Sequence, residues 1–161
     1  MAAERRDMAA ALALGIRPMT DADVTSVAAL ELASYAFPWS EQIFRDSLRV
    51  GYLCSVMELG VVLAGYGVLA TGAGEAHLLN LCVREQFRNR GLGSRLLQHL
   101  LQQARDTDTH VIFLETRASN QAAARLYEAH RFVQIGVRRG YYQAAGGRED
   151  AIVMRRALGE A

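Results

Sequence analysis

The sequence of 161 residues contains no lysine, since all 18 of its basic residues are arginine. This absence excludes enzymes that depend on a lysine, such as P-loop phosphate-binding proteins, Schiff-base enzymes and pyridoxal phosphate enzymes. Only two prolines occur, and hydrophobic residues make up 51% of the chain, which argues against a disordered protein. The formal net charge of +1 predicts no general attraction to nucleic acid or to an anionic membrane.

Cysteine is also scarce. Cys54 and Cys82 lie within hydrophobic runs and are not spaced as a CxxC pair. This pattern predicts buried, unreactive thiols in a reducing compartment, and neither a disulfide framework nor a zinc site. No other cluster of His, Cys, Asp and Glu has metal-ligand spacing, so we expect an enzyme without a metal.

The chain contains no hydrophobic run long enough to span a membrane. Residues 8–16 form the longest run near the N-terminus, and Glu4 and Asp7 disfavour its interpretation as a signal peptide. We therefore expect a cytoplasmic protein that does not associate with membranes. At roughly 100–200 residues per domain, the length predicts one domain over residues 1–161, with residues 1–11 as a frayed extension.

Hydrophobic periodicity predicts an α/β domain. We expect strands at residues 12–17, 52–59, 61–70, 76–83, 110–116, 132–142 and 151–156, and helices at about 21–34, 41–48, 91–106 and 121–130. Thr20, Ser40 and Asn120 are the predicted N-caps, and Gly60 is the predicted hairpin turn. This order predicts one central mixed sheet of about seven strands with helices on both faces.

The most informative segment connects a strand to a helix through a polar turn. Gly91 and Gly93 carry no Cβ, so the backbone N–H groups there can approach a ligand closely. The N-terminus of the following helix adds N–H donors and a positive dipole end, and Arg88 and Arg90 add charge. Together these features predict a pyrophosphate-binding site. A glycine turn with solvated arginines and no ligand is the alternative.

Two familiar phosphate-binding loops do not fit this turn. The Walker pattern requires a lysine, which the sequence lacks. The dinucleotide fingerprint requires a third glycine, and Leu96 occupies that position.

The pattern Arg88-x-x-Gly91-x-Gly93 resembles the acetyl-CoA signature Gln/Arg-x-x-Gly-x-Gly/Ala of the GCN5-related N-acetyltransferase (GNAT) family. Four further segments resemble those bacterial members that acetylate the N-terminal alanine of a small-subunit ribosomal protein: residues 37–41, 114–120, 124–128 and 147–151. The resemblance covers about residues 12–156 and implies the GNAT fold. One departure is Arg131, which stands before Phe132 where many relatives carry a glycine.

The resemblance implies that acetyl-CoA is the co-substrate. The backbone of Leu81, Cys82 and Val83 would contact the acetyl group and the pantetheine arm, and Asn120 would form a hydrogen bond to the pantetheine. The turn would hold the pyrophosphate through Arg88, Asn89, Arg90, Gly91, Leu92, Gly93 and Ser94.

Glu115 is the candidate general base. It shares a strand face with Val111 and Phe113, and a carboxylate on an apolar face needs either a partner or a chemical role. A salt bridge to an arginine such as Arg117 is the structural alternative. The resemblance favours a base that removes a proton from the substrate amine through a water molecule. His77, by contrast, is expected to be an ordinary strand residue.

Tyr127 is the candidate general acid, because a phenol can donate a proton to the departing thiolate. It lies on the apolar side of its helix with Ala123 and His130. The alternative is a tyrosine that only anchors the helix to the sheet. Around these residues, Phe37-Pro38-Trp39 is either a gate over the substrate or a hydrophobic staple, and Glu149 and Asp150 either attract a basic peptide or lie in a solvated hairpin.

The expected activity is transfer of acetyl to the N-terminal α-amine of a ribosomal protein, by direct attack in a ternary complex. An α-amine has a pKa of about 7.7–8.0, so one modest base suffices to neutralise it. The alternatives are acetylation of a small-molecule amine and a catalytically silent acetyl-CoA-binding module. The expected partner is the N-terminal segment of a ribosomal protein, with no direct nucleic-acid binding. The oligomeric state is not specified by the sequence.

Overall fold

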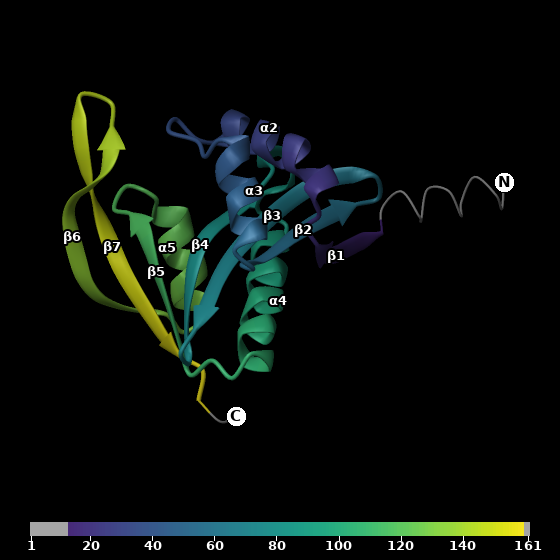
Figure 1. Ribbon diagram of the computed structural model, residues 1–161. Coiled ribbons are helices and arrows are strands. Elements are labelled where there is room, and N and C mark those ends of the chain that lie inside the picture. Colours follow the sequence, from purple (N-terminus) through teal and green to yellow (C-terminus); the bar gives the residue numbers. More distant parts are fainter. Residues whose placement is uncertain (1–12, 160–161) are drawn as a thin grey trace, which may run out of the picture. The chain divides into compact units, whose positions relative to one another are not determined.

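The computed structural model describes residues 13–159 (Figure 1). Four α-helices, two short 3₁₀ helices (η) and seven strands follow one another along these residues. The elements are β1 (Leu14–Pro18), η1 (Asp21–Asp23), α2 (Val24–Ser34), α3 (Glu41–Arg49), β2 (Leu53–Leu59), β3 (Val62–Gly72), β4 (Glu75–Val83), η2 (Glu85–Phe87), α4 (Leu92–Asp106), β5 (Val111–Arg117), α5 (Gln121–Ala129), β6 (Val133–Ala144) and β7 (Gly147–Ala157).

The strands form a mixed sheet of seven in the order β1-β2-β3-β4-β5-β7-β6 within the described range. The α/β class and the seven-stranded mixed sheet are as predicted from the sequence. Two compact units divide the described residues, 13–68 with 80–100 and 69–79 with 101–159. The single domain over residues 1–161 remains a prediction, and the expected frayed extension at residues 1–11 lies outside the described range.

The first unit begins with an antiparallel pair, in which β1 and β2 align Leu14 with Leu59 and Pro18 with Ser55. Gly60 forms the predicted turn after β2 with a left-handed φ of +63°. The predicted cap of α3 is also confirmed, because the Ser40 side chain accepts a hydrogen bond from the backbone N–H of Ile43 at 3.3 Å.

A buried carboxylate organises the interior of this unit. Glu31 lies on the inward face of α2 and is only 2% exposed. Its Oε1 accepts hydrogen bonds from the Tyr66 hydroxyl at 2.6 Å and from Asn80 Nδ2 at 2.9 Å, and its Oε2 accepts one from the backbone N–H of Trp39 at 3.0 Å. Three donors therefore compensate the loss of hydration of a charged group.

The Phe37-Pro38-Trp39 segment is fixed by two contacts at Trp39. Its backbone N–H binds Glu31, and its ring lies 5.3 Å from the ring of Phe44 in α3, measured between centroids. These contacts support the staple over the gate, because they join the segment to both α2 and α3.

Both cysteines are free and buried, as expected from their apolar surroundings. Burial raises the pKa of Cys54 to about 11, so its thiol remains protonated and unreactive at neutral pH.

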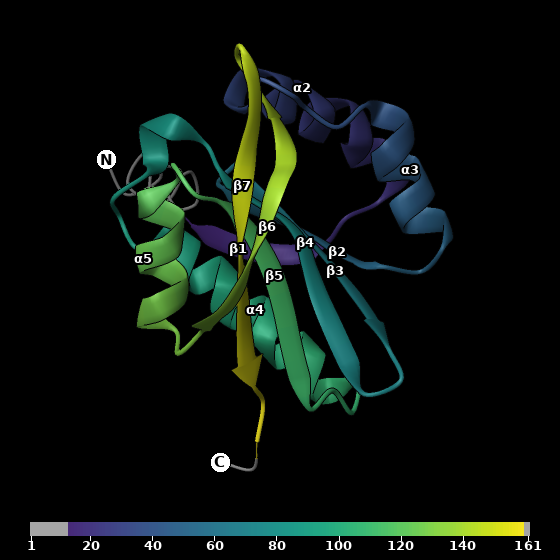
Figure 2. The same cartoon turned by 90° about the vertical axis from the view of Figure 1, so that its left-hand side faces the viewer.

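The second unit contains one parallel and two antiparallel strand pairs. The start of β4 is parallel to β5, with His77 beside Phe113. The strands β5 and β7 are antiparallel, with Glu115 opposite Val153, and β6 continues the sheet beside β7 (Figure 2).

The β6–β7 hairpin is longer than predicted. Its ladder continues through Tyr142 opposite Glu149 to Ala144 opposite Gly147, whereas the sequence predicted that the second strand starts at residue 151. Backbone pairing extends through polar residues that carry no hydrophobic alternation, so the pattern underestimates the strand.

The helix α5 begins as predicted, with Asn120 Oδ1 accepting a hydrogen bond from the N–H of Ala123 at 3.1 Å. Its C-terminal end is formed by Arg131, which has a left-handed φ of +67°. The N–H of Arg131 donates to the Glu128 carbonyl and the N–H of Phe132 to the Tyr127 carbonyl, each at 3.0 Å. A left-handed residue with a Cβ is strained, so this position favours glycine.

Replacing Arg131 by glycine is therefore expected to stabilise the protein. Relief of about 1–2 kcal/mol of left-handed strain exceeds the roughly 0.5–1 kcal/mol entropic cost of a glycine. Chemical denaturation should show a gain of about 0.5–1 kcal/mol in the free energy of unfolding. The control is Arg125→Gly inside α5, which should lose about 1 kcal/mol. A loss of stability in Arg131→Gly would show that its side-chain contacts outweigh the backbone strain.

Candidate active site

The predicted phosphate-binding turn connects β4 to α4. The strand ends at Val83, and the short helix η2, which the sequence did not predict, follows it. The chain then reaches α4 through two left-handed residues, Asn89 with a φ of +62° and Gly91 with a φ of +76°. The turn therefore depends on the absence of a Cβ at Gly91 and on the tolerance of asparagine for this conformation.

Gly91 leaves open space beside the start of α4. A Cβ built on this residue meets no atom within 4 Å. The first hydrogen bond of α4 joins the N–H of Arg95 to the Gly91 carbonyl at 3.1 Å, so the N–H groups that precede it face the open end of the helix. An uncrowded helix N-terminus of this kind fits a phosphate group.

Both arginines of the turn contact the turn itself. Arg88 Nε donates a hydrogen bond to the Val83 carbonyl at 2.9 Å, and the Arg90 guanidinium lies over the Phe87 ring, 6.0 Å from its centroid. The structure thus joins two predicted residues, Arg88 and Val83, and keeps positive charge at the turn.

The end of β4 is held by side chains from α2 and by the backbone of β3. The Tyr35 hydroxyl donates to the Leu81 carbonyl at 3.0 Å, and the buried Cys82 thiol lies 3.5 Å from the Ser34 hydroxyl. A Cβ on Gly65 would lie 2.5 Å from the Cys82 carbonyl oxygen, so only glycine permits this close approach of β3. The binding roles of the Leu81, Cys82 and Val83 backbone remain predictions.

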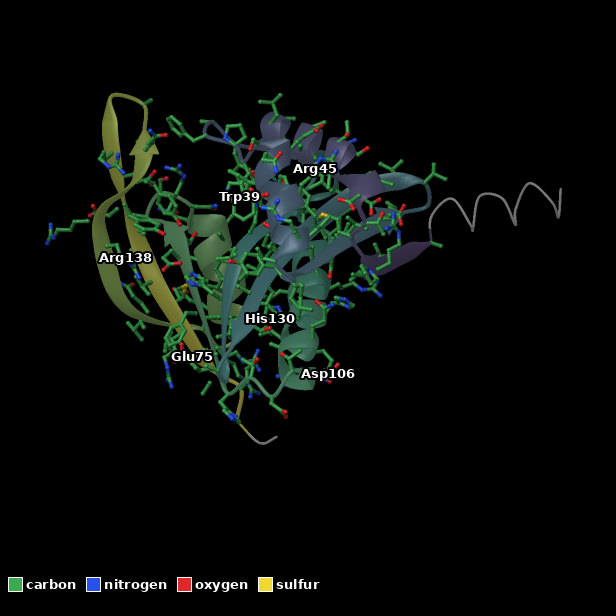
Figure 3. The ribbon with its side chains drawn as sticks, viewed as in Figure 1. Trp39, Arg45, Glu75, Asp106, His130 and Arg138 are labelled. Atoms are coloured by element: carbon green, nitrogen blue, oxygen red, sulfur yellow. The ribbon has the colours of Figure 1, made fainter. Side chains whose placement is uncertain are left out.

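In the second unit, Glu115 projects from β5 with its side chain only 8% exposed. His77 Nε2 forms a short hydrogen bond with Glu115 Oε2, and Arg138 Nε of β6 lies 3.5 Å from Oε1. Figure 3 labels Arg138 on β6. Arg117, the partner considered from the sequence, binds Glu149 at 3.2 Å. The carboxylate therefore has an imidazole partner that the sequence did not predict.

His77 was expected to be an ordinary strand residue; it lies in β4, and its hydrogen bond to Glu115 was not predicted. The parallel register places it beside Phe113, and therefore on the same face as Glu115, one pleat away along β5. No signal in the sequence specifies that β4 pairs with β5, so this contact could not be found before the fold was known.

Tyr127 lies on α5 and is 8% exposed, with its ring 5.7 Å from that of Phe132. Burial, with a smaller contribution from Tyr142, raises its pKa well above the usual tyrosine value, so the hydroxyl holds its proton at neutral pH. Within residues 13–159 this hydroxyl forms no hydrogen bond, which leaves it able to donate one to a ligand. The general-acid role of Tyr127 remains a prediction. The alternative, that Tyr127 only anchors α5 to the sheet, also remains open.

The other candidate polar residues are engaged in local structure. Asn120 uses its Oδ1 to cap α5, and its role toward pantetheine remains a prediction. Glu149 accepts hydrogen bonds from the N–H of Ser119 at 2.8 Å and from Arg117. The Ser119 side chain, then its N–H and then Arg117 lower the pKa of Glu149. Asp150 accepts one from the N–H of Gly140 at 2.9 Å. Both acidic residues therefore stabilise the hairpin and the loop before α5.

Residues 13–159 contain no group of three or more His, Cys, Asp or Glu residues arranged to hold a metal ion. None of the helices in this range has the length and apolar character needed to cross a membrane.

Comparison with known proteins shows the family. The acetyltransferase (GNAT) family model matches residues 24–132. The [ribosomal protein bS18]-alanine N-acetyltransferase of Escherichia coli strain K12 is 34% identical over 139 residues, 86% of this chain and 94% of that protein. The enzyme of that name from Salmonella typhimurium is 36% identical over 136 residues, 84% of this chain and 92% of that protein.

The fold agrees with these matches. The crystal structure of the ribosomal-protein-S18-alanine N-acetyltransferase from Escherichia coli has a TM-score of 0.86 and 33% identity, and covers 92% of this chain and 96% of that chain. The chain therefore belongs to the acetyltransferase (GNAT) family.

Proposed function

We propose that this protein transfers the acetyl group of acetyl-CoA to the N-terminal alanine of ribosomal protein bS18. The observation that carries the proposal is 34% identity, over 86% of this chain and 94% of the relative, with a protein of that name. The product is an N-acetylated α-amine, and the reaction proceeds by direct attack of the amine on the thioester in a ternary complex. Its proposed substrate is a component of the ribosome, so we place the enzyme in the cytoplasm.

The turn before α4 is the proposed holder of the acetyl-CoA pyrophosphate. Support comes from the open space at Gly91, the helix N-terminus beside it, and the charge of Arg88 and Arg90. The Gly93 and Ser94 backbone belongs to the same helical turn. Acetyl-CoA supplies an activated acetyl thioester, and the chain supplies binding and proton transfer.

Glu115 is the proposed base. The substrate ammonium must lose a proton before it can attack, and a carboxylate that is 8% exposed can take part in this transfer through a water molecule. We further propose that the backbone N–H of Val83 stabilises the oxyanion and that Tyr127 returns a proton to the thiolate. The raised pKa of Tyr127 supports this role, because the phenol is protonated when it is needed.

Mass spectrometry tests the function directly. Purified bS18 is incubated with the protein and acetyl-CoA, and we expect one added acetyl group on the N-terminal alanine. A protein that acetylates only small amines would support the small-molecule alternative. A protein that binds acetyl-CoA but releases no CoA with any amine would be the silent module.

Substitution of Gly91 tests the proposed cradle. Gly91→Val fills the open space and should weaken acetyl-CoA binding by at least about 10-fold in calorimetry, because a side chain obstructs the approach to the N–H groups. Arg90→Ala should have a smaller effect. Gly51→Val is the matched control, since Gly51 has a φ of +87° and the same open surroundings but lies after α3. Equal weakening by Gly91→Val and Gly51→Val would count against the cradle.

The pH dependence of two variants tests the proton transfers. Glu115→Gln should lower kcat by roughly 10²–10⁴-fold with little change in acetyl-CoA affinity. The decrease in kcat of Glu115→Gln should be smaller at high pH, where the α-amine is already neutral. Tyr127→Phe should also lower kcat, but high pH should not restore it. Wild-type kcat at neutral pH in either variant would return that residue to a structural role.

A further inference from the structure

The short contact between His77 and Glu115 suggests a more specific route for the proton. We propose that the proton of the substrate amine comes to rest on the imidazole of His77, while Glu115 orients the ring and balances its charge. This inference rests on the proposed acetyl transfer and refines the part of Glu115 in it: the carboxylate supplies the charge and the imidazole supplies the acceptor atom.

The proposal assigns the hydrogen of this contact to His77 Nε2. In that arrangement the Glu115 carboxylate accepts the hydrogen bond, as an ionised carboxylate must. A neutral imidazole with a hydrogen on Nε2 has an unprotonated Nδ1. The ring nitrogen opposite the carboxylate is therefore the atom that can accept a proton.

The His77 side chain is more exposed to solvent than the Glu115 side chain, as release of a proton from the imidazole to solvent requires. The Glu115 side chain is 8% exposed, whereas the His77 side chain is 38% exposed. A proton held on the imidazole can thus leave to solvent, and the nearly buried carboxylate remains in place for the next cycle. Both side chains project from hydrogen-bonded strands, so their relative position is set by the β4–β5 register.

Several charged or titratable groups from neighbouring elements surround the pair. Arg138 and Tyr142 come from β6, Arg117 from β5 and Arg155 from β7, where it lies opposite Phe113. Guanidinium groups have no lone pair available near neutral pH, and burial raises the pKa of Tyr142 to about 12.

Two further proton-accepting side chains lie at the start of the β4–β5 pair. Glu75, labelled in Figure 3, is an exposed carboxylate on the same face of β4. His110 precedes β5 in the opposite parity to Glu115, and its ring lies beside Gly74. Among these groups, His77 is the imidazole that forms a hydrogen bond with Glu115.

The chemistry favours an imidazole as the acceptor. In general an α-amine has a pKa of about 7.7–8.0, an imidazole about 6.5 and a carboxyl group about 4.3. Transfer from an ammonium is therefore roughly 100-fold more favourable to an ordinary imidazole than to an ordinary carboxylate. An acid and a base of similar strength also exchange protons most efficiently.

The step balances without any other reactant. The N–H bond of the ammonium breaks, directly or through one water molecule, and an N–H bond forms at Nδ1 of His77. The neutral amine keeps the electron pair with which it attacks the thioester carbonyl. The resulting imidazolium pairs with the Glu115 carboxylate, and it later releases the same proton to solvent.

Nitrogen-15 NMR of the whole protein tests the pair without using activity. We expect the neutral ring of His77 to carry its hydrogen on Nε2, with His77→Gln identifying the signal by its loss. Glu115→Ala should change the shifts of this ring and leave those of His99 in α4 unchanged. A neutral His77 with its hydrogen on Nδ1 would overturn the proposal.

Kinetics with an alanine-starting peptide test the proton transfer. His77→Gln keeps an N–H donor for Glu115 but cannot accept a proton, and we expect kcat to fall about 10–100-fold at pH 7. The KM for acetyl-CoA should not change. The difference in kcat between His77→Gln and the wild type should become smaller at high pH. Added imidazole should restore part of the activity of His77→Ala. The control His99→Gln should behave as wild type.

The outcomes separate this inference from the proposed function. If the wild type acetylates the peptide and His77→Gln retains its kcat and pH profile, only the role of His77 is wrong. If the wild type acetylates no amine, the proposed function fails, and the NMR result still decides whether the pair exists as described.

Discussion

The buried carboxylate of Glu31 is the constraint on which the first unit depends. A charge at this depth would cost several kcal/mol if it lacked hydrogen-bond donors. Its three donors come from Trp39, Tyr66 and Asn80, which lie on the loop after α2, on β3 and on β4. Each segment must reach its final position before the carboxylate is satisfied. The same β4 continues to the backbone predicted to contact acetyl-CoA, so the internal charge also fixes the start of the candidate site.

Local signals in the sequence were sufficient for much of the fold. The caps at Ser40 and Asn120 and the turn at Gly60 depend on residues only a few positions apart, and the structure confirms them. The glycine turn before α4 was found in the same way. The α/β class followed from the succession of elements along the chain, because each apolar run was long enough to indicate its type.

The missed polar contacts depend on segments that are distant in the sequence. The hydrogen bonds of Glu31 reach residues up to 49 positions away, and those of Glu115 reach one 38 positions away. A hydrophobic pattern identifies an inward-facing position but does not reveal which polar partner meets it there. The polar part of the β6–β7 hairpin was missed for a related reason, because backbone pairing and not side-chain alternation holds it.

The positive charges of the turn and the hairpin have one further consequence. Arg90 lies over Phe87, Arg117 over Tyr142 and Arg138 over Tyr141, so each of these cations contacts an aromatic ring. In place of a guanidinium, a lysine would bring a primary amine, which is itself an acceptor for acetyl groups. A chain with no lysine has no side-chain amine of this kind. An acetyltransferase built in this way carries charge to bind a phosphate or orient a peptide and offers no side-chain primary amine for self-acetylation.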